Sequence, residues 1–351
     1  MKKNTRFAFN AYLQQLARLN GVAVEELSSK FTVEPSVQQT LEDQIQQSAA
    51  FLTLINVTPV TEQSGQLLGL GVGSTIAGTT DTTAKEREPV DPTLMVDVEY
   101  KCEQTNFDTV LTYAKLDLWA KFQDFQVRIR DAIVKRQALD RIMIGFNGVK
   151  RAKTSNRSEN PLLQDVNKGW LQKIREDAPD HVMGSTTGGE TTPGAVKVGK
   201  GGEYANLDAV VMDAVNELID VVYQDDDDLV VICGRELLSD KYFPLVNKEQ
   251  ENSEKLAADM IISQKRMGGL QAVRAPFFPP NALLITRLDN LSIYWQEDTR
   301  RRSVIDNPKR DRIENFESVN EAYVVEDYRC AALVENIQIG DFSAAAAETG
   351  A

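Results

Sequence analysis

The stretch KLDLWAKFQDFQVRIRDAIVKRQALDRIMIGFN, residues 115–147, carries the strongest secondary-structure signal in the chain. It contains no proline and no glycine before Gly145, and its apolar side chains recur at spacings of three, four or seven. The spacing predicts a single helix of about 28 residues, about 42 Å long at 1.5 Å per residue, which ends at Asn147 and Gly148. One face of this helix, interrupted by Arg136, would carry Leu118, Phe122, Phe125, Ile129, Ala132, Leu139, Met143 and Phe146.

The residues before this helix, 61–114, have the opposite character. Glycines and threonines dominate the first half, and two prolines, Pro89 and Pro92, mark the return. Apolar residues then alternate at period two, which predicts β-strands. The pattern indicates one long β-hairpin with too few apolar side chains for a core of its own. Because an isolated two-stranded hairpin is marginally stable in water, this one has to pack on something else.

The N-terminal part contains a helix followed by a break. Apolar residues at helical spacing over 7–20 precede Gly21, which is in the position of a C-terminal cap. A short helical stretch covers 24–29, and KFTVEP at 30–35 then interrupts the pattern. Pro35 keeps the residue before it extended and suits the first turn of a second helix. A strand is predicted at 54–60.

The rest of the chain mixes helices and strands, which predicts an α+β protein. A Gly/Thr-rich loop lies at 185–202, and the tail 343–351 is small, polar and expected to fray. The spacing predicts helices at 162–174, 207–222, 235–242 and 253–264, and strands at 229–233, 271–274, 282–287, 291–295, 323–327 and 332–339.

Composition limits the function classes. The chain has 351 residues with 39 basic and 52 acidic side chains, a net charge of −13, which makes it a poor general binder of nucleic acid. The charge is uneven, however, because residues 114–157 carry +7 and residues 1–31 carry +3, leaving −23 elsewhere. Parts of one copy could therefore attract parts of another.

Compartment follows from cysteine usage and from the N-terminus. Cys102, Cys233 and Cys330 are far apart and odd in number, which favours a reducing compartment over a disulfide framework. The basic start lacks the apolar run of a signal peptide. No stretch approaches the ~18 apolar residues of a membrane span. We expect a soluble protein made in the cytoplasm that contacts no membrane.

No catalytic constellation is apparent. The single histidine, His181, excludes a multi-histidine metal site and is expected at the surface. The sequence GSTIAGTT at 73–80 lacks the lysine of a phosphate-binding loop, because Thr79 stands in its place. Asp225–Asp228 lacks the spacing of a calcium loop and is expected to form a solvated turn. Cys233 ends an apolar strand and is expected to be an inert core thiol. No metal or cofactor is predicted.

Two groups of basic side chains remain open to two interpretations. They could bind phosphates or carboxylates, or they could form solvated and salt-bridged surface, which the sequence alone favours. The residues concerned are Lys150, Arg151, Lys153 and Arg157, and then Arg300, Arg301, Arg302, Lys309, Arg310 and Arg312.

The order of these parts resembles the Hong Kong 97-type capsid fold. Specific stretches are similar to the major capsid precursors of Peduovirus-type tailed phages, and the likeness spans nearly the whole chain. The stretches are KFTVEPS at 30–36, LDLWAKFQDFQ at 116–126, GFNGVKR at 145–151, DLVVI at 228–232, DKYFPLVNKEQ at 240–250 and YVVEDY at 323–328.

This resemblance implies an α+β capsid fold with seven parts. The extended hairpin would lie over a neighbouring subunit, and the long helix would be the spine of the peripheral domain. The loop at 185–199 has no counterpart, and no motif for an isopeptide cross-link is matched. The expected parts are an N-terminal prosegment at 1–31, an N-terminal arm at 32–60, the hairpin loop at 61–114, the peripheral domain with its spine helix at 115–200, the axial domain at 201–300, return strands of the peripheral domain at 301–342 and a flexible tail at 343–351.

The resemblance also implies a function without catalysis. The chain would assemble from pentamers and hexamers, on an internal scaffolding protein and with a portal protein, into an icosahedral head shell. The shell would enclose double-stranded DNA, contacted nonspecifically, and would form in the host cytoplasm as part of the virion. A phage maturation protease would remove the N-terminus near the bond between Phe31 and Thr32.

Three alternatives stay open at this point. A hydrolase or nucleotide-using enzyme is disfavoured by the incomplete motifs, and a DNA-binding protein by the net charge of −13. For residues 1–31, a helix docked permanently on the domain is as compatible with the sequence as a removable segment.

Overall fold

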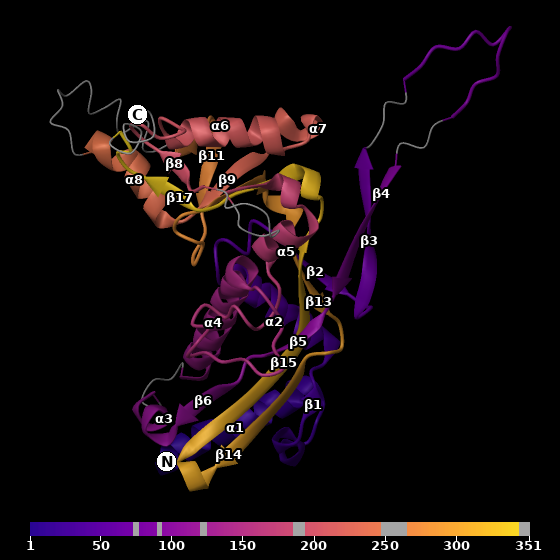
Figure 1. Cartoon of the computed structure of the whole chain (residues 1–351). Coiled ribbons are helices and arrows are strands. Elements are labelled where there is room, and N and C mark those ends of the chain that lie inside the picture. The colour runs from indigo at the N-terminus through magenta and orange to yellow at the C-terminus, as the bar shows by residue number, and fades with distance from the viewer. Residues whose placement is uncertain (73–76, 90–92, 120–124, 185–193, 247–264, 344–351) are drawn as a thin grey trace.

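Two β-sheets form the frame of the molecule (Figure 1). The computed structural model describes residues 1–72, 77–89, 93–119, 125–184, 194–246 and 265–343. In the larger, seven-stranded sheet the strand order is β1-β14-β15-β13-β2, with β5 and β6 also paired to β15. Its strands are β1 (Phe31–Thr32), β2 (Asn56–Val60), β5 (Glu103–Asn106), β6 (Thr109–Thr112), β13 (Leu291–Gln296), β14 (Arg301–Asn307) and β15 (Arg312–Val325).

The smaller sheet has six strands in the order β10-β11-β9-β12-β16-β7. Its centre is β9, whose five residues are all buried, as its continuous apolar sequence predicts. Val230 and Ile232 face the core shared with the long helix, whereas Leu229, Val231 and Cys233 face α6. The strands are β7 (Val182–Met183), β9 (Leu229–Cys233), β10 (Arg266–Met267), β11 (Leu270–Arg274), β12 (Leu283–Arg287) and β16 (Ala331–Val334).

Helices cover both sheets. Apart from the two sheets, the helices and the hairpin described below, the described residues form two short paired strands and several 3-10 turns. The strands are β8 (Val196–Val198) and β17 (Ile337–Ile339), and the turns are Val24–Ser28, Pro179–His181, Leu288–Asn290, Pro308–Arg310 and Tyr328–Cys330. The helices are α1 (Lys3–Asn20), α2 (Pro35–Gln47), α3 (Tyr113–Trp119), α4 (Phe125–Asn147), α5 (Trp170–Asp177), α6 (Leu207–Leu218), α7 (Val221–Gln224) and α8 (Arg235–Val246).

The long helix is present as α3 and α4 on either side of residues 120–124. Those five residues lie outside the described part of the chain, so the single continuous helix stays a prediction. The predicted apolar face is correct near the C-terminal end, where Met143 and Phe146 are buried, but Leu118 is 57% exposed. In its N-terminal half α4 instead buries Val134, because the helix there packs against α2 rather than along one continuous seam.

A close contact of α4 with α5 completes the main core. The indole of Trp170 is fully buried and donates from Nε1 to the carbonyl oxygen of Ser292 at 2.9 Å. A Cβ at Gly145 would lie 2.2 Å from the Trp170 ring, so glycine at this position lets the ring lie directly on the helix backbone. Phe51 and Phe146 pack against the same ring.

The hairpin is confirmed, but it is shorter than the sequence indicated. Its strands β3 (Ser64–Val72) and β4 (Thr93–Lys101) pair only with each other and project away from the rest of the molecule (Figure 1). Residues 103–112, which the period-two pattern assigned to the hairpin, form β5 and β6 of the large sheet instead. The pattern identifies strands but not their partner, and β15 supplies that partner here.

Other boundaries also differ from those predicted. The helix expected over 162–174 begins only at Trp170, because Leu163 has a positive φ of 59° and Asp165 organises the preceding loop through hydrogen bonds. The residue pattern did not predict β14 or the first half of β15, because their polar side chains do not alternate with apolar ones, although both lie in the range 301–342 where the resemblance implies return strands. β13 lies within 201–300 but pairs in the large sheet, and β16 lies within 301–342 but pairs in the small one.

Several predictions fall outside the described residues. They are Phe122 of the predicted helix face, the helix at 253–264, most of the loop at 185–199, the first part of the glycine stretch at 73–80 and nearly all of the tail.

Candidate functional site

The predicted processing bond lies in the edge strand β1 of the large sheet. Phe31 pairs with Arg302 and Thr32 with Arg301, antiparallel to β14. The backbone here is extended, as predicted, and residues 28–30 before it are exposed. Phe31 is half-buried beneath the N-terminal segment, whereas Thr32 is exposed. Pairing with β14 therefore holds the backbone of both residues along one edge of the strand, and the side chain of Thr32 stays exposed.

Helix α1 lies beside β14 (Figure 1). Its apolar side packs on side chains of β6, α3, β14 and β15, and we call the surface that they form the groove. Phe9, Leu16 and Ala17 point inward and are at most 8% exposed. Gly21 ends the helix in the left-handed conformation, with φ of 64°, as the sequence predicts. Leu27 of the following 3-10 turn is 1% exposed and belongs to the same cluster. The N-terminal segment is thus docked on the body of this subunit.

Polar contacts fix α1 at its N-terminal half. Arg6 Nη1 lies 2.5 Å from Asp306 Oδ2, and the Tyr113 hydroxyl also donates to Asp306. The Lys2 amide donates to Asp117 Oδ1 at 2.8 Å. Hydrogen bonds from Thr5 and from this amide lower the pKa of Asp117. The groove therefore has acidic groups at the end where the segment carries its positive charge.

A second set of charged residues is buried in the centre of the large sheet. Arg141 of α4 donates from Nη1 to Glu42 Oε2 at 2.6 Å, and from Nη2 to Glu321 Oε1 at 2.6 Å. Arg300 donates to the other Glu42 oxygen at 2.5 Å, and it also pairs with Glu317. All five side chains are at most 3% exposed. We call these five residues the buried ionic network; it joins α2, α4, β15 and the start of β14.

The pKa values in this network move in opposite directions. Burial alone would raise the pKa of Glu42, but the charges of Arg141 and Arg300 lower it to about 2. Burial raises the pKa of Glu321, because Arg141 only partly offsets it. Sequence reasoning missed Arg141 and treated Arg300 as a surface group. A charged residue one helical turn beyond Ala138, on the face that Val134 begins, was the available signal.

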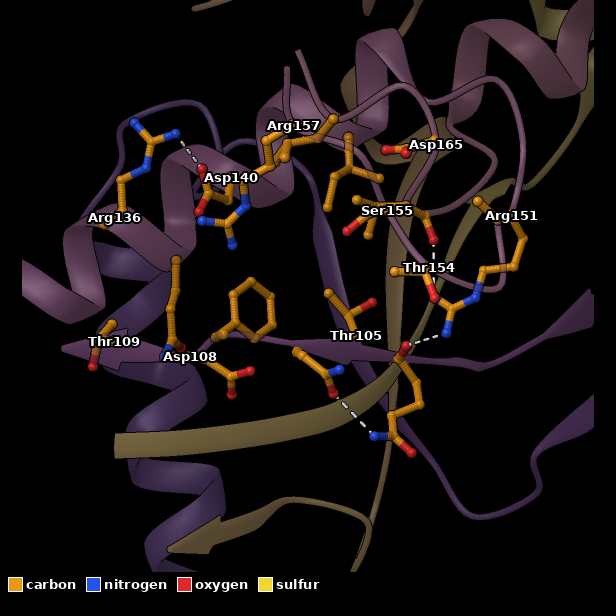
Figure 2. Close-up of a pocket in the computed structure, with 18 of the residues that line it drawn as sticks. Thr105, Asp108, Thr109, Arg136, Asp140, Arg151, Thr154, Ser155, Arg157 and Asp165 are labelled. Atoms are coloured by element: carbon orange, nitrogen blue, oxygen red, sulfur yellow. Dashed lines mark hydrogen bonds and ion pairs between the residues drawn. The ribbon is translucent and has the colours of Figure 1, made fainter. Parts of the chain in front are cut away.

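Arg151, Lys153 and Arg157 of the first basic group line a pocket of about 490 Å³ between α4, the β5–β6 segment and the loop 151–166 (Figure 2). Arg136 is paired with Asp140, whose pKa is raised by burial. Arg151 donates to the carbonyl oxygens of Gln104 and Val166, at 2.5 and 2.8 Å. Its guanidinium thus ties the loop to β5 and is part of the architecture rather than a free ligand.

The walls of this pocket contain polar atoms without partners in the structure. Thr105 and Gln137 are each 3% exposed, and Thr105 Oγ1 and Gln137 Oε1 make no hydrogen bond. Arg157 and Lys153 are exposed at its rim. Among the described residues that line the pocket, no three His, Cys, Asp or Glu side chains converge as metal ligands.

The second basic group is divided between core and surface. Arg300 is in the buried ionic network, and Arg302 is half-buried, donating to the Tyr12 hydroxyl and to Asn315 Oδ1, both at 2.8 Å. Arg312 pairs with Glu314. Arg301, Lys309 and Arg310 are exposed. The surface interpretation is therefore correct for part of this group and wrong for Arg300.

The other residues singled out in the sequence have structural environments. His181 is half-buried with Nδ1 3.1 Å from the Ala331 carbonyl oxygen, so the surface prediction is wrong. Asp226 lies in the turn before β9 and pairs with Arg287 at 3.0 Å. Burial raises the thiol pKa of Cys233 and Cys330 to about 11 and that of Cys102 to about 12, as expected for inert core thiols.

Within the described ranges, no three His, Cys, Asp or Glu side chains converge as metal ligands. Among the described helices, none has the length and hydropathy needed to cross a membrane.

Comparisons with known proteins match the chain over nearly its whole length. Residues 8–337 match the family model described as phage major capsid protein, P2 family. The capsid protein of Escherichia phage P2 is 59% identical over 357 residues, covering 100% of both chains. The major capsid protein of Serratia phage KSP20 is 40% identical, covering 96% of this chain and 97% of that protein.

Solved structures give the same result. A chain of the satellite phage P4 procapsid, a structure that includes the size determination protein Sid, superposes with a TM-score of 0.80 at 56% identity, covering 98% of this chain and 100% of that one. The capsid of an empty GTA particle, at 14% identity and a TM-score of 0.50 over 83% of this chain and 90% of that one, shares the fold alone.

Proposed function

Because this chain belongs to the P2 family of phage major capsid proteins, we propose that it builds the head shell as pentamers and hexamers on an internal scaffolding protein. As a member of this family it is a structural shell protein of the virion with the Hong Kong 97-type fold, not an enzyme. The observation that carries the proposal is the hairpin, β3 with β4, which pairs with no other described strand of its own chain. A neighbouring copy would supply the missing contact.

The large sheet with α4 would form the peripheral domain, and the small sheet with α6 the axial domain. Residues 32–60 would form the N-terminal arm. This division follows the sheets rather than the predicted boundaries, since β13 and β16 cross them. A portal protein and packaged double-stranded DNA are the further partners of such a shell.

Co-expression with a scaffolding protein and electron microscopy of the product test this assembly. Closed shells with five- and six-fold capsomers are expected. Only monomers under every condition, with the scaffold present, would contradict the proposal.

We further propose that residues 1–31 serve assembly and are cleaved from the chain near the bond between Phe31 and Thr32. The extended edge strand supports this, because proteases bind extended backbone and exposed flanks. Intact mass of the subunit from mature particles is the test: a chain starting at Thr32 is expected, and one that still starts at Met1 or Lys2 would rule the cleavage out.

A further inference from the structure

We propose that the groove beneath α1 is a binding site for a basic amphipathic helix, and that residues 1–31 remain bound there after the chain is cut beside Phe31. This inference takes its biological setting from the proposed cleavage. Its physical basis is independent of which protease makes the cut.

The floor of the groove is apolar and is built from several elements. It contains Leu111 of β6, Leu116 of α3, Ile129 of α4, Val304 of β14 and Ile313 of β15. Leu116, Val304 and Ile313 are at most 6% exposed while α1 is in place. An empty groove would expose this apolar surface to water, which is unfavourable in proportion to the area exposed.

The occupant matches this floor in shape. Phe9 and Leu16 are seven residues apart, two helical turns, so they lie on one face of α1. Beside Phe9 a cavity of about 30 Å³ remains between α1 and the floor, and a second hollow of about 160 Å³ lies between Leu16 and α4, so the fit is closest at the N-terminal half of α1. Phe7, on the other side of the helix, is 63% exposed. The helix thus binds through one apolar stripe, as a separate peptide helix would bind in a groove.

The occupant also matches the groove in charge. Residues 1–31 carry +3, whereas the remaining residues carry −16. On the body side, Asp306 receives Arg6 and Asp117 receives the Lys2 amide. Arg302 donates to the Tyr12 hydroxyl, which adds a polar contact at the middle of the helix. The groove therefore selects a helix with a basic N-terminal turn over a neutral or acidic one.

The position of the cut decides what cleavage changes. Every contact described between α1 and the body is made by residues on the N-terminal side of the bond between Phe31 and Thr32. Leu27 adds a further buried apolar contact on that same side. Breaking the bond removes only the tether, which provides effective concentration, and leaves all these contacts intact. Cleavage alone would therefore not vacate the groove, and a competing binder or a rearrangement of the body is needed.

The experiment uses the unassembled full-length chain without scaffold. The exposed residues 28–30 are replaced by the recognition sequence of a specific protease, and the folded protein is then cut. We expect the N-terminal fragment to co-elute with the body in size-exclusion chromatography at micromolar concentration. An excess of labelled peptide of residues 1–27 should displace it. A fragment that separates from a folded body under native conditions overturns the proposal.

Two matched variants of the labelled peptide make the test specific. Phe9→Ala should weaken competition roughly a hundredfold or more, because it removes a buried ring. Phe7→Ala, two residues away on the exposed side, should compete like the unchanged peptide. Equal competition by both variants would mean that the groove does not recognise the stripe. Because the cut is made at an introduced protease site, a negative result here does not contradict the proposed maturation. Likewise, a native chain that is not cleaved during maturation does not contradict binding of the helix in the groove.

Discussion

At the scale of single residues, the buried ionic network sets the most specific requirements. Arg141 lies between two carboxylates from different elements, Glu42 of α2 and Glu321 of β15. Removing one member of such a network leaves an uncompensated charge away from water. The network therefore acts as a check that α2, α4 and β15 have come together correctly.

The first prediction concerns Arg141. Arg141→Met should lower the free energy of unfolding by about 3–5 kcal/mol, because two buried carboxylates lose their shared cation. The matched control is Arg136→Met on the same helix, where the side chain is 55% exposed and pairs with Asp140. That change should stay within about 1 kcal/mol. Chemical denaturation of the unassembled chain measures both, and similar losses for the two variants would contradict the network's role.

The second prediction concerns acid stability. The pKa of Glu42 is about 2 in the folded chain, against ~4.3 in an unfolded one. Its contribution to stability is therefore complete above pH ~4.3 and is lost as the pH falls toward 2. Glu321 has the opposite effect on stability. Because its pKa is raised in the folded chain, protonation of Glu321 as the pH falls favours the folded state. Arg141 pairs with both of these carboxylates, and Arg300 pairs with Glu42 and Glu317.

Glu42→Gln should therefore flatten the acid side of the stability curve. Unfolding free energies from denaturant titrations at pH values between about 2 and 5 measure the slope. The variant will be less stable at neutral pH, so the comparison rests on slope and not on absolute stability. An unchanged slope would show that Glu42 does not titrate in this range.

At the scale of elements, the hairpin is the part least supported by its own chain. Its strands pair only with each other, and its base touches the body through Leu67 and Tyr100 near Tyr294. Deleting residues 66–90 should leave a cooperatively folding monomer but abolish shell formation. Thermal melting and electron microscopy with scaffold present are the measurements. Loss of the cooperative melt would place the hairpin in the core instead.

Elements with a clean period were predictable, and elements with polar partners were not. The sequence identified α1 with its Gly21 cap and the apolar strand β9, because their local patterns have one interpretation. The residue pattern missed β14 and the start of β15 because their buried polar residues have partners elsewhere in the chain: Glu317 pairs with Arg300, and Asn315 accepts from Arg302. Charged residues are assigned to the surface unless their partners are known. Partners that are far apart along the chain cannot be recognised from a local sequence pattern.

The candidate sites show the same limit. The family resemblance placed the processing bond near Phe31, and Pro35 with the break in periodicity indicated only that the backbone there is extended. The groove under α1 could not, since its floor comes from five elements spread between Leu111 and Ile313. The sequence indicated the pocket near Arg151 only as a basic stretch. It did not predict that Thr105 and Gln137 line the pocket, because the fold brings these residues together.

At the scale of the whole molecule, charge governs encounters with nucleic acid. The net charge of −13 becomes −16 without residues 1–31, while residues 114–157 keep +7. We expect weak, sequence-independent association with double-stranded DNA that decreases steeply with salt. Binding measured at 50 and 200 mM salt tests this, with two unrelated DNA sequences as the control. Tight binding that resists salt and discriminates between the sequences would contradict it.

The hairpin enters and leaves the body through two strands of the same sheet. The chain reaches it from β2, which pairs along five residues with β13, and leaves it into β5, which pairs along four residues with β15. A neighbouring subunit that pulls on the hairpin therefore applies force to both strand pairings together, because the hairpin is attached to the sheet at both of its ends. β13 and β15 are themselves paired, so the pull spreads through the widest part of the sheet. In a shell under internal pressure, pulling one hairpin out of its own sheet would require the hydrogen bonds of β2 with β13 and of β5 with β15 to break together.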